Sequence, residues 1–302
     1  MTIIVDSGST KTTWMDVKSG NKIVTEGLNP HFTSDEVFLK ACSIVREKYT
    51  PQPPSRGDEE GLSMRPPLRG AGGVYTIFFY GAGCGNPNQR ERVERLLKEA
   101  FDTVNVQVET DMLGACRAVS GDEPSLVGIL GTGSNACYYD GKKVVYQAFS
   151  AGYILGDHGS ANHVGRKLLE TYLSGHMPYN TAADFHATYP LSHEELIEMV
   201  YHRPNPNRFL ASLAPFALKN SRYTFIAAML ENCFNEWIRF QVESISEKSK
   251  CTDLCIVGGF GKAMESRIKN YVVYDDMPYT IKKIISDPII GLRKYHLKYY
   301  SL

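Results

Sequence analysis

Asp6 and the residues after it form the first group of side chains that could do chemistry. Asp6 ends an apolar run, and the small residues Ser7-Gly8-Ser9-Thr10 follow it. Glycine lets a backbone approach a ligand closely, and consecutive turn amides form an anion-binding concavity. A carboxylate just before such a turn is placed to hold a divalent metal beside phosphates. Taken alone, this stretch also fits an ordinary hairpin turn.

The stretch is not a P-loop. That motif needs Gly, four residues, and then Gly-Lys-Ser/Thr ahead of a helix. Here no second glycine precedes Lys11, and Thr12, Thr13 and Trp14 favour a strand over a helix. The sequence therefore predicts a turn between two strands.

A second carboxylate with chemical potential is Asp111. It follows a predicted strand over 103–108, in the run Glu109-Thr110-Asp111. At that place a carboxylate could accept a proton from a hydroxyl. It could also cap the helix predicted over 112–119, a role that Asp fills well. Both roles can hold at once.

Two further glycine turns follow predicted strands. Gly131-Thr132-Gly133-Ser134 comes after 126–130, and Gly258-Gly259-Phe260-Gly261 comes after 254–257 and before a helix near Lys262. A strand that delivers glycines to a helix N-terminus favours a nucleotide, because the amides and the helix dipole attract phosphates and the missing side chains leave room for adenosine.

The elements around these turns repeat. Strands are predicted over 3–6, 12–17 and 22–25, and again over 126–130, 136–139 and 143–147. Both sets read strand, small-residue turn, strand, tight turn, strand, about 120 residues apart, so an internal duplication is predicted. A capping box at Thr33 and Glu36 opens the first helix, and Asn86 with Pro87 opens the second. Later helices are predicted over 162–173, 193–201, 207–220, 223–246 and 288–299.

Composition sets wider limits. The chain has 302 residues, is 43% hydrophobic and carries 33 basic and 33 acidic residues, so its net charge indicates neither a nucleic acid nor a membrane surface as partner. Seven cysteines within apolar segments predict reduced thiols. With no apolar window of membrane-spanning length, we expect a soluble, cytoplasmic protein. Thr50–Gly73, rich in Pro and Gly, is predicted to be a solvated loop.

Together, the three glycine turns resemble the actin-like ATPase superfamily, whose two similar halves each supply a phosphate hairpin and whose second half adds an adenosine turn. Within it the chain, apart from Thr50–Gly73, is similar to the N-acetylglucosamine kinase branch, also described as the BadF/BadG type of ATPase. The matching positions are Asp6–Thr10, Asn29, Gly81–Cys84, Asp111, Gly131–Ser134, Leu155–Ser160 and Val257–Gly261.

This resemblance implies an α/β, ribonuclease H-like fold with duplicated domains around a nucleotide cleft. Domain I would cover residues 1–116 and the C-terminal helix in 288–302, and domain II would cover 117–287. The implied activity is a kinase that uses ATP and Mg²⁺ to phosphorylate a hydroxyl of an N-acetylated amino sugar. Closing of the lobes would exclude water.

The resemblance also assigns roles to single residues. Asp6 would hold the metal, Asp111 would accept the proton of the sugar hydroxyl, and Asn29, Gly83 and Asp157 would bind the sugar. His158 stands where the family usually has Glu, so the sugar here can differ. The nucleotide would be held by Gly8, Ser9, Thr10, Lys11, Gly131, Thr132, Gly133, Ser134, Gly258, Gly259 and Phe260.

The sequence also bears on two other classes of function. An ATP-driven activator with a shared iron–sulfur cluster needs cysteines presented together, whereas these lie in apolar runs, and Cys251 and Cys255 are predicted core thiols. A sensor without turnover does not need both Asp6 and Asp111, so the presence of both argues against that class.

His158 and His163 are five residues apart, off one helix face, so no metal-binding pair is expected. The sequence leaves open a homodimer, the sugar and the hydroxyl phosphorylated.

Overall fold

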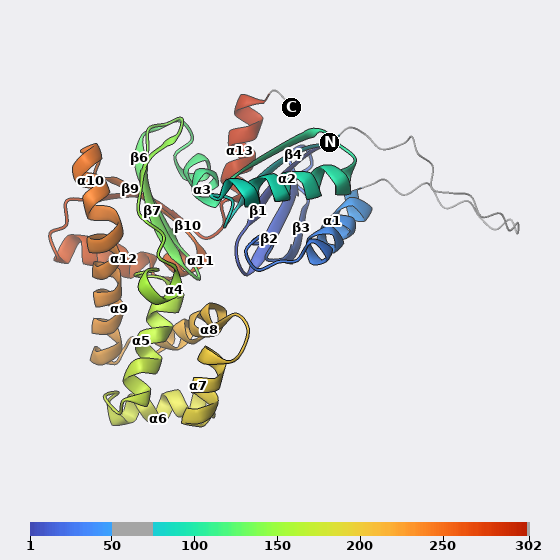
Figure 1. Ribbon diagram of the computed structural model, residues 1–302. Helices are drawn as coiled ribbons and strands as arrows, with labels where there is room; N and C mark the ends of the chain where they lie inside the picture. The colour runs from blue at the N-terminus through green and yellow to red at the C-terminus, as the bar shows by residue number, and fades with distance from the viewer. Residues whose placement is uncertain (50–74, 301–302) are drawn as a thin grey trace, which may run out of the picture. The chain divides into compact units, whose positions relative to one another are not determined.

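The computed structural model describes residues 1–49 and 75–300 (Figure 1). The predicted loop Thr50–Gly73 lies outside these residues. The chain divides into two compact units, which we describe separately. Unit 1 is Met1–Asp111 with His296–Leu302, and unit 2 is Met112–Tyr295.

Unit 1 is built on a five-stranded sheet with the order β3-β2-β1-β4-β5. The predicted opening meander is confirmed, because β1, β2 and β3 pair antiparallel in sequence order. β4 and β5 then add in parallel beside β1. The strands are β1 (Thr2–Ser7), β2 (Lys11–Asp16), β3 (Lys22–Glu26), β4 (Thr76–Gly81) and β5 (Asn105–Thr110).

Both faces of β4 are buried, which explains its continuous apolar sequence. Ile77 and Phe79 pack in the core below α1 (Asp35–Tyr49) and α2 (Pro87–Phe101). Phe78 and Tyr80 alternate with them. Their rings lie against His296 in α13 (Ile289–Tyr299), and the Tyr80 hydroxyl is 2.9 Å from its Nε2.

The two helix starts in unit 1 test the capping predictions. The side chain of Asn86 accepts a hydrogen bond from the Asn88 amide, with Pro87 in the first turn, so the predicted start of α2 is confirmed. The box predicted at Thr33 is wrong by one position. The Ser34 hydroxyl accepts from the Val37 amide, while Thr33 donates to the Gly27 carbonyl.

Unit 2 repeats the sheet. Its order, β10-β9-β6-β7-β8, is that of the first sheet with β6, β7, β8, β9 and β10 in the places of β1 to β5, so the predicted duplication is confirmed. The fifth strand, β10, was not predicted. The strands are β6 (Ser125–Leu130), β7 (Ser134–Tyr139), β8 (Val144–Gln147), β9 (Asp253–Val257) and β10 (Thr280–Ile285).

The second sheet is also covered on both faces. Leu126, Leu130 and Ile256 belong to the large core cluster that the helices of unit 2 complete. Val127 and Val257 pack instead with α3 (Asp111–Val119). The other helices are α4 (Gly152–Leu155), α5 (Ala161–Leu173), α6 (Tyr179–Thr188), α7 (His193–Tyr201), α8 (Pro206–Lys219), α9 (Thr224–Trp237), α10 (Glu243–Ser249), α11 (Gly259–Ala263) and α12 (Glu265–Tyr274).

The single long helix predicted over 223–246 is interrupted. A π-helical turn, η1 (Ile238–Val242), joins α9 to α10. In Figure 1, α5 leads away from the second sheet to a group formed with α6, α7 and α8. None of the helices over residues 1–49 and 75–300 has the length and apolar character needed to cross a membrane.

Candidate functional site

The predicted catalytic and metal carboxylates lie at one edge of the first sheet. Asp6 pairs with Tyr80, and Ser7 pairs with Gly81, which in turn pairs with Thr110. Asp111 directly follows Thr110 and is the first residue of α3. The carboxyl ends of three parallel strands therefore bring the turn after Asp6, the turn after Gly81 and Asp111 to the same edge, where open α/β sheets bind their ligands.

Cys84 supports the placement of Asp111. Burial, and after it the charge of the Asp111 carboxylate, raise the pKa of the Cys84 thiol to about 12. The Asp111 carboxylate therefore lies near Cys84 and the turn that follows β4. Both Asp6 and Asp111 are half-buried.

The first glycine turn is tied to the predicted sugar residues. The Gly8 amide donates to the Lys11 carbonyl over 3.0 Å, which closes the turn between β1 and β2. Asn29 donates from Nδ2 to the Ser9 hydroxyl over 3.3 Å. A Cβ on Gly83 would lie 2.5 Å from Asn29 Oδ1, and Gly83 has φ of +85°, so this position requires glycine. Unit 1 thus brings Ser9, Asn29 and Gly83 together.

The second glycine turn is held by the start of α5 and the loop before it. The Gly131 amide donates to the Gly133 carbonyl, and the amides of Ala161 and Asn162 donate to the carbonyls of Gly131 and Thr132, each over 3.0 Å. The second turn is therefore fixed from outside by a helix N-terminus.

Asp157 uses both carboxylate oxygens within unit 2. Oδ1 accepts from the Ser134 amide over 3.2 Å, and Oδ2 accepts from Asn162 Nδ2 over 2.8 Å. A Cβ on Gly133 would lie 2.8 Å from Oδ2, so the turn fits closely against this carboxylate. Burial raises the pKa of Asp157, although the hydrogen bonds from Asn162 and Ser134 lower it in part. This predicted sugar residue therefore also holds the second glycine turn.

The predicted adenosine turn packs beside the end of β6. Gly258 has φ of +131°, and a Cβ there would lie 2.2 Å from the Leu130 carbonyl oxygen. Gly259 begins α11 and is exposed, and beyond its chain neighbours and its own helix no described atom lies within 4 Å of where its Cβ would be. Phe260 is buried in the large core cluster. Unit 2 thus brings the second and third glycine turns together, with Gly259 on the open side.

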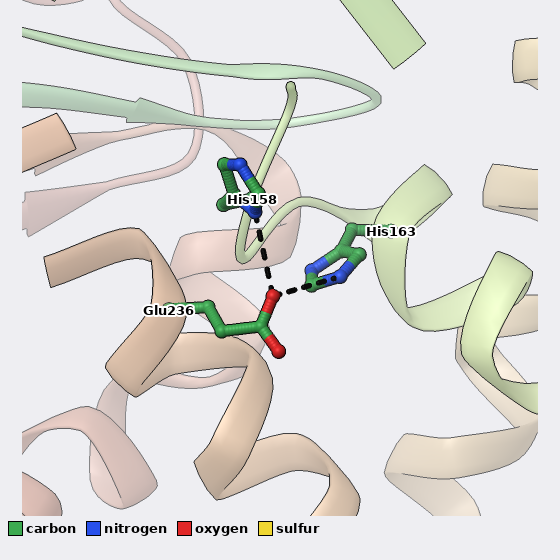
Figure 2. Close-up of side chains that lie close together, drawn as sticks. All are labelled: His158, His163 and Glu236. Carbon is green, nitrogen blue, oxygen red and sulfur yellow. Dashed lines mark ion pairs between the residues drawn. The ribbon is translucent and has the colours of Figure 1, made fainter. Parts of the chain in front are cut away.

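The histidines of this region lie close together, contrary to the expectation from their spacing. Figure 2 shows His158 and His163 facing the Glu236 carboxylate, with each facing nitrogen 3.4 Å from Oε2. Their spacing did not predict this proximity, because His158 lies in the loop before α5, where helical spacing does not apply. Burial lowers the pKa of His163 to about 3, and Arg166 adds to this.

Sequence reasoning missed the residues that support the second turn. Gln241 Nε2 donates to the Ser134 hydroxyl over 3.1 Å, across 107 positions of sequence, and Ser134 donates in turn to the His158 carbonyl over 2.6 Å. Glu236 and Asn162 were also missed. No motif links these residues, because it is the packing of α9, η1 and α5 that brings them to the turn.

Comparisons with known structures bear out the fold. A proposed N-acetylglucosamine kinase from Porphyromonas gingivalis is 29% identical, with a TM-score of 0.82, over 99% of this chain and 100% of that one. A proposed N-acetylglucosamine kinase from Chromobacterium violaceum is 16% identical, with a TM-score of 0.70, over 97% and 98%. The MamK protein of a double helical filament is 12% identical, with a TM-score of 0.52, over 100% and 99%.

The chain therefore has the actin-like ATPase fold, built twice on one sheet topology, as predicted. Within that fold it is similar over nearly all of its length to the two proposed N-acetylglucosamine kinases, so the resemblance seen in the sequence is confirmed. No protein-family model matches the sequence. A search of curated proteins gives no significant match.

Proposed function

We propose that the chain is a kinase that transfers the γ-phosphate of ATP to a hydroxyl of an N-acetylated amino sugar, N-acetylglucosamine or a close relative. The observation that carries the proposal is the shared edge of β1, β4 and β5, where Asp6, the Gly81 turn and Asp111 meet. The similarity to the two proposed N-acetylglucosamine kinases supports the choice of sugar.

The glycine turns fit a nucleotide. An added Cβ at Gly131 would lie 4.0 Å from the Gly133 carbonyl oxygen, and one at Gly8 would lie 3.6 Å from the Lys11 carbonyl oxygen, so these two positions leave room for a ligand beside the backbone. Gly259 is equally open among the described atoms. We assign the phosphates to Gly8–Lys11 of unit 1 and Gly131–Ser134 of unit 2, and the adenosine to Gly258 and Gly259.

Asp6 fits a magnesium ion that is bound together with phosphates. Mg²⁺ prefers oxygen ligands and is usually held by one or two carboxylates, with substrate phosphates and waters completing its shell. Asp6 offers a half-buried carboxylate one residue before the first turn begins. When bound, the ion would neutralise charge on the phosphate oxygens.

Asp111 would act as the base for the sugar hydroxyl. Phosphoryl transfer needs positioning and charge stabilisation more than covalent help, and a base for the nucleophile completes the set. Asp111 starts α3, so the helix N-terminus holds it in place while its carboxylate accepts the proton. Asn29 and Gly83 in unit 1 and Asp157 in unit 2 would contact the sugar.

The direct test is ADP release with Mg-ATP and a panel of glucosamine, N-acetylglucosamine and N-acetylmuramic acid. We expect turnover with an N-acetylated sugar and a preference over glucosamine. The Asp111→Asn variant in the same assay separates true transfer from contaminating ATPase. Equal ADP release with and without every sugar would refute the proposal.

The iron–sulfur activator is not favoured. A cluster needs accessible thiolates, and burial raises the pKa of Cys42, Cys84 and Cys233 each to about 12. Six of the seven cysteines are buried, and they are divided among separate core clusters. The thiols therefore act as core residues.

A further inference from the structure

The helix that runs from Thr224 to Ser249 contains one irregular turn. In η1 the Glu243 amide donates to the Ile238 carbonyl, five residues back, instead of the four of an α-helix. Such π-turns inside α-helices occur frequently at functional sites. Here residues within this turn and next to it reach the second phosphate turn.

Three side chains on this helix contact the same small region. Glu236 faces His158, the Phe240 ring stacks on the His158 ring at 4.5 Å and 26°, and Gln241 donates to the Ser134 hydroxyl. In a regular α-helix, residues five apart point roughly 140° away from each other. The wider π-turn reduces that angle, which allows Glu236 and Gln241 to serve one site.

The group formed by His158, His163 and Glu236 has the side chains of a metal site, and its ligand atoms lie within 4.8 Å of one another. The hydrogen bonding of His163 argues against a metal. Its Nδ1 accepts from the Gly159 amide over 3.0 Å, so in the neutral ring the proton lies on Nε2. A metal-bound histidine donates from its other ring nitrogen, whereas here that nitrogen is an acceptor.

The proton on Nε2 of His163 also fixes the arrangement around Glu236. His163 directs this N–H towards Oε2, and His158 Nδ1 lies at the same 3.4 Å from that oxygen. Neither nitrogen makes a hydrogen bond with any described residue, and both are buried. An unprotonated His158 Nδ1 would set its lone pair against the carboxylate, so the proton of His158 belongs on Nδ1. Glu236 thus faces two N–H groups.

We propose that Glu236 and Gln241, brought to one side by the π-turn, are positioning residues for the second phosphate turn. This inference rests on the proposed function. Glu236 acts through His158, whose carbonyl accepts the Ser134 hydroxyl, and Gln241 acts on that hydroxyl directly. Together with Asp157 on the Ser134 amide, they fix the residue that ends the turn from three directions.

The test compares the binding of Mg-ADP and of adenosine by calorimetry. Gln241→Leu should raise the Kd for Mg-ADP about 3- to 10-fold, the range for one lost hydrogen bond, and leave the Kd for adenosine unchanged. Glu236→Ala should act the same way, and Glu236→Gln, which keeps an oxygen towards both N–H groups, should restore most of the affinity. Glu243→Gln, on the exposed start of α10, is the matched control.

Each outcome of these binding measurements supports or overturns the positioning role. A general loss of structure would weaken adenosine and Mg-ADP together, and equal weakening overturns the positioning role. Unchanged Mg-ADP binding in both Gln241→Leu and Glu236→Ala also overturns it, while the proposed function stands. If the wild type binds neither ligand, the proposed function fails and the inference falls with it. Zn²⁺ that raises the wild-type melting temperature but not that of His163→Asn would identify a metal site instead.

Discussion

His163 gives a prediction about stability that does not depend on the function. Its side chain is fully buried in unit 2, and burial lowers its pKa from the ordinary 6.5 to about 3. Below pH 6.5 the unfolded chain takes up a proton that the folded chain does not bind until about pH 3. The free energy of unfolding should therefore be unaffected by this group above pH 6.5 and fall progressively as the pH drops below it.

The size of the effect follows from the same values. Each pH unit in which only the unfolded state is protonated costs about 1.4 kcal/mol, so from pH 7 to pH 5 the wild type should lose about 2 kcal/mol through His163. Glu236 opposes this, because its carboxylate would favour a protonated ring. The loss between pH 7 and pH 5 hardly changes while the pKa of His163 in the folded state stays below about 4. The value of about 2 kcal/mol therefore holds even if Glu236 raises that pKa slightly.

The perturbation is His163→Asn, which removes the titrating ring and keeps an oxygen near the Gly159 amide. The assay is urea unfolding at pH 7 and pH 5, followed by tryptophan fluorescence in a Trp14→Phe background so that Trp237 reports on unit 2. The variant should lose about 2 kcal/mol less than the wild type between the two pH values. His202→Asn, which removes an exposed imidazole, is the control. Equal losses in wild type and His163→Asn would refute the argument.

Three further predictions concern the proposed site. Asp111→Asn should lower sugar phosphorylation by roughly 10²- to 10⁴-fold with little change in melting temperature, because Asn cannot accept the proton; near-normal turnover would leave Asp111 as a helix-start residue only. Mg-ATP should raise the melting temperature, and Gly259→Val should abolish that shift without unfolding the protein. Gly258→Val should instead destabilise the protein by about 2 kcal/mol or more, because Gly258 has a positive φ and an added side chain would meet the Leu130 carbonyl. A retained shift in Gly259→Val counts against the adenosine assignment. Asp6→Asn should raise the magnesium concentration needed for half-maximal turnover, and an unchanged requirement would make Asp6 structural.

The sequence predicted the fold because the fold is encoded in short patterns. The apolar strands and the tight turns of both meanders can be recognised locally, and Asn86-Pro87 marks the start of α2 without reference to any distant residue. β10 escaped prediction because Lys282 and Lys283 interrupt its apolar pattern at the edge of the sheet. The π-turn escaped because its residues have ordinary helical character.

The candidate site was predictable only in part, because only some of its residues belong to short sequence patterns. The three glycine turns are visible as strings of small residues, so their positions could be predicted before their surroundings were known. The residues that support these turns could not be predicted. Neither Gln241, which contacts Ser134 from 107 positions away, nor Glu236 belongs to a motif. The proximity of His158 and His163 was not predicted, because helical spacing does not apply to a residue in a loop.

The two glycine turns therefore differ in how they are held, although the two sheets are topological copies. The first is closed by its own hairpin and by Asn29, 20 positions from Ser9 in the same meander. The second is held by the start of α5, whose amides donate to the carbonyls of the turn, and by Gln241 in η1, which donates to the Ser134 hydroxyl. The hairpin itself does not provide those helices, so the support of the second turn comes from the segment between β8 and β9. Substitutions of Glu236 in α9 and of Gln241 in η1 should then change phosphate binding at the second turn.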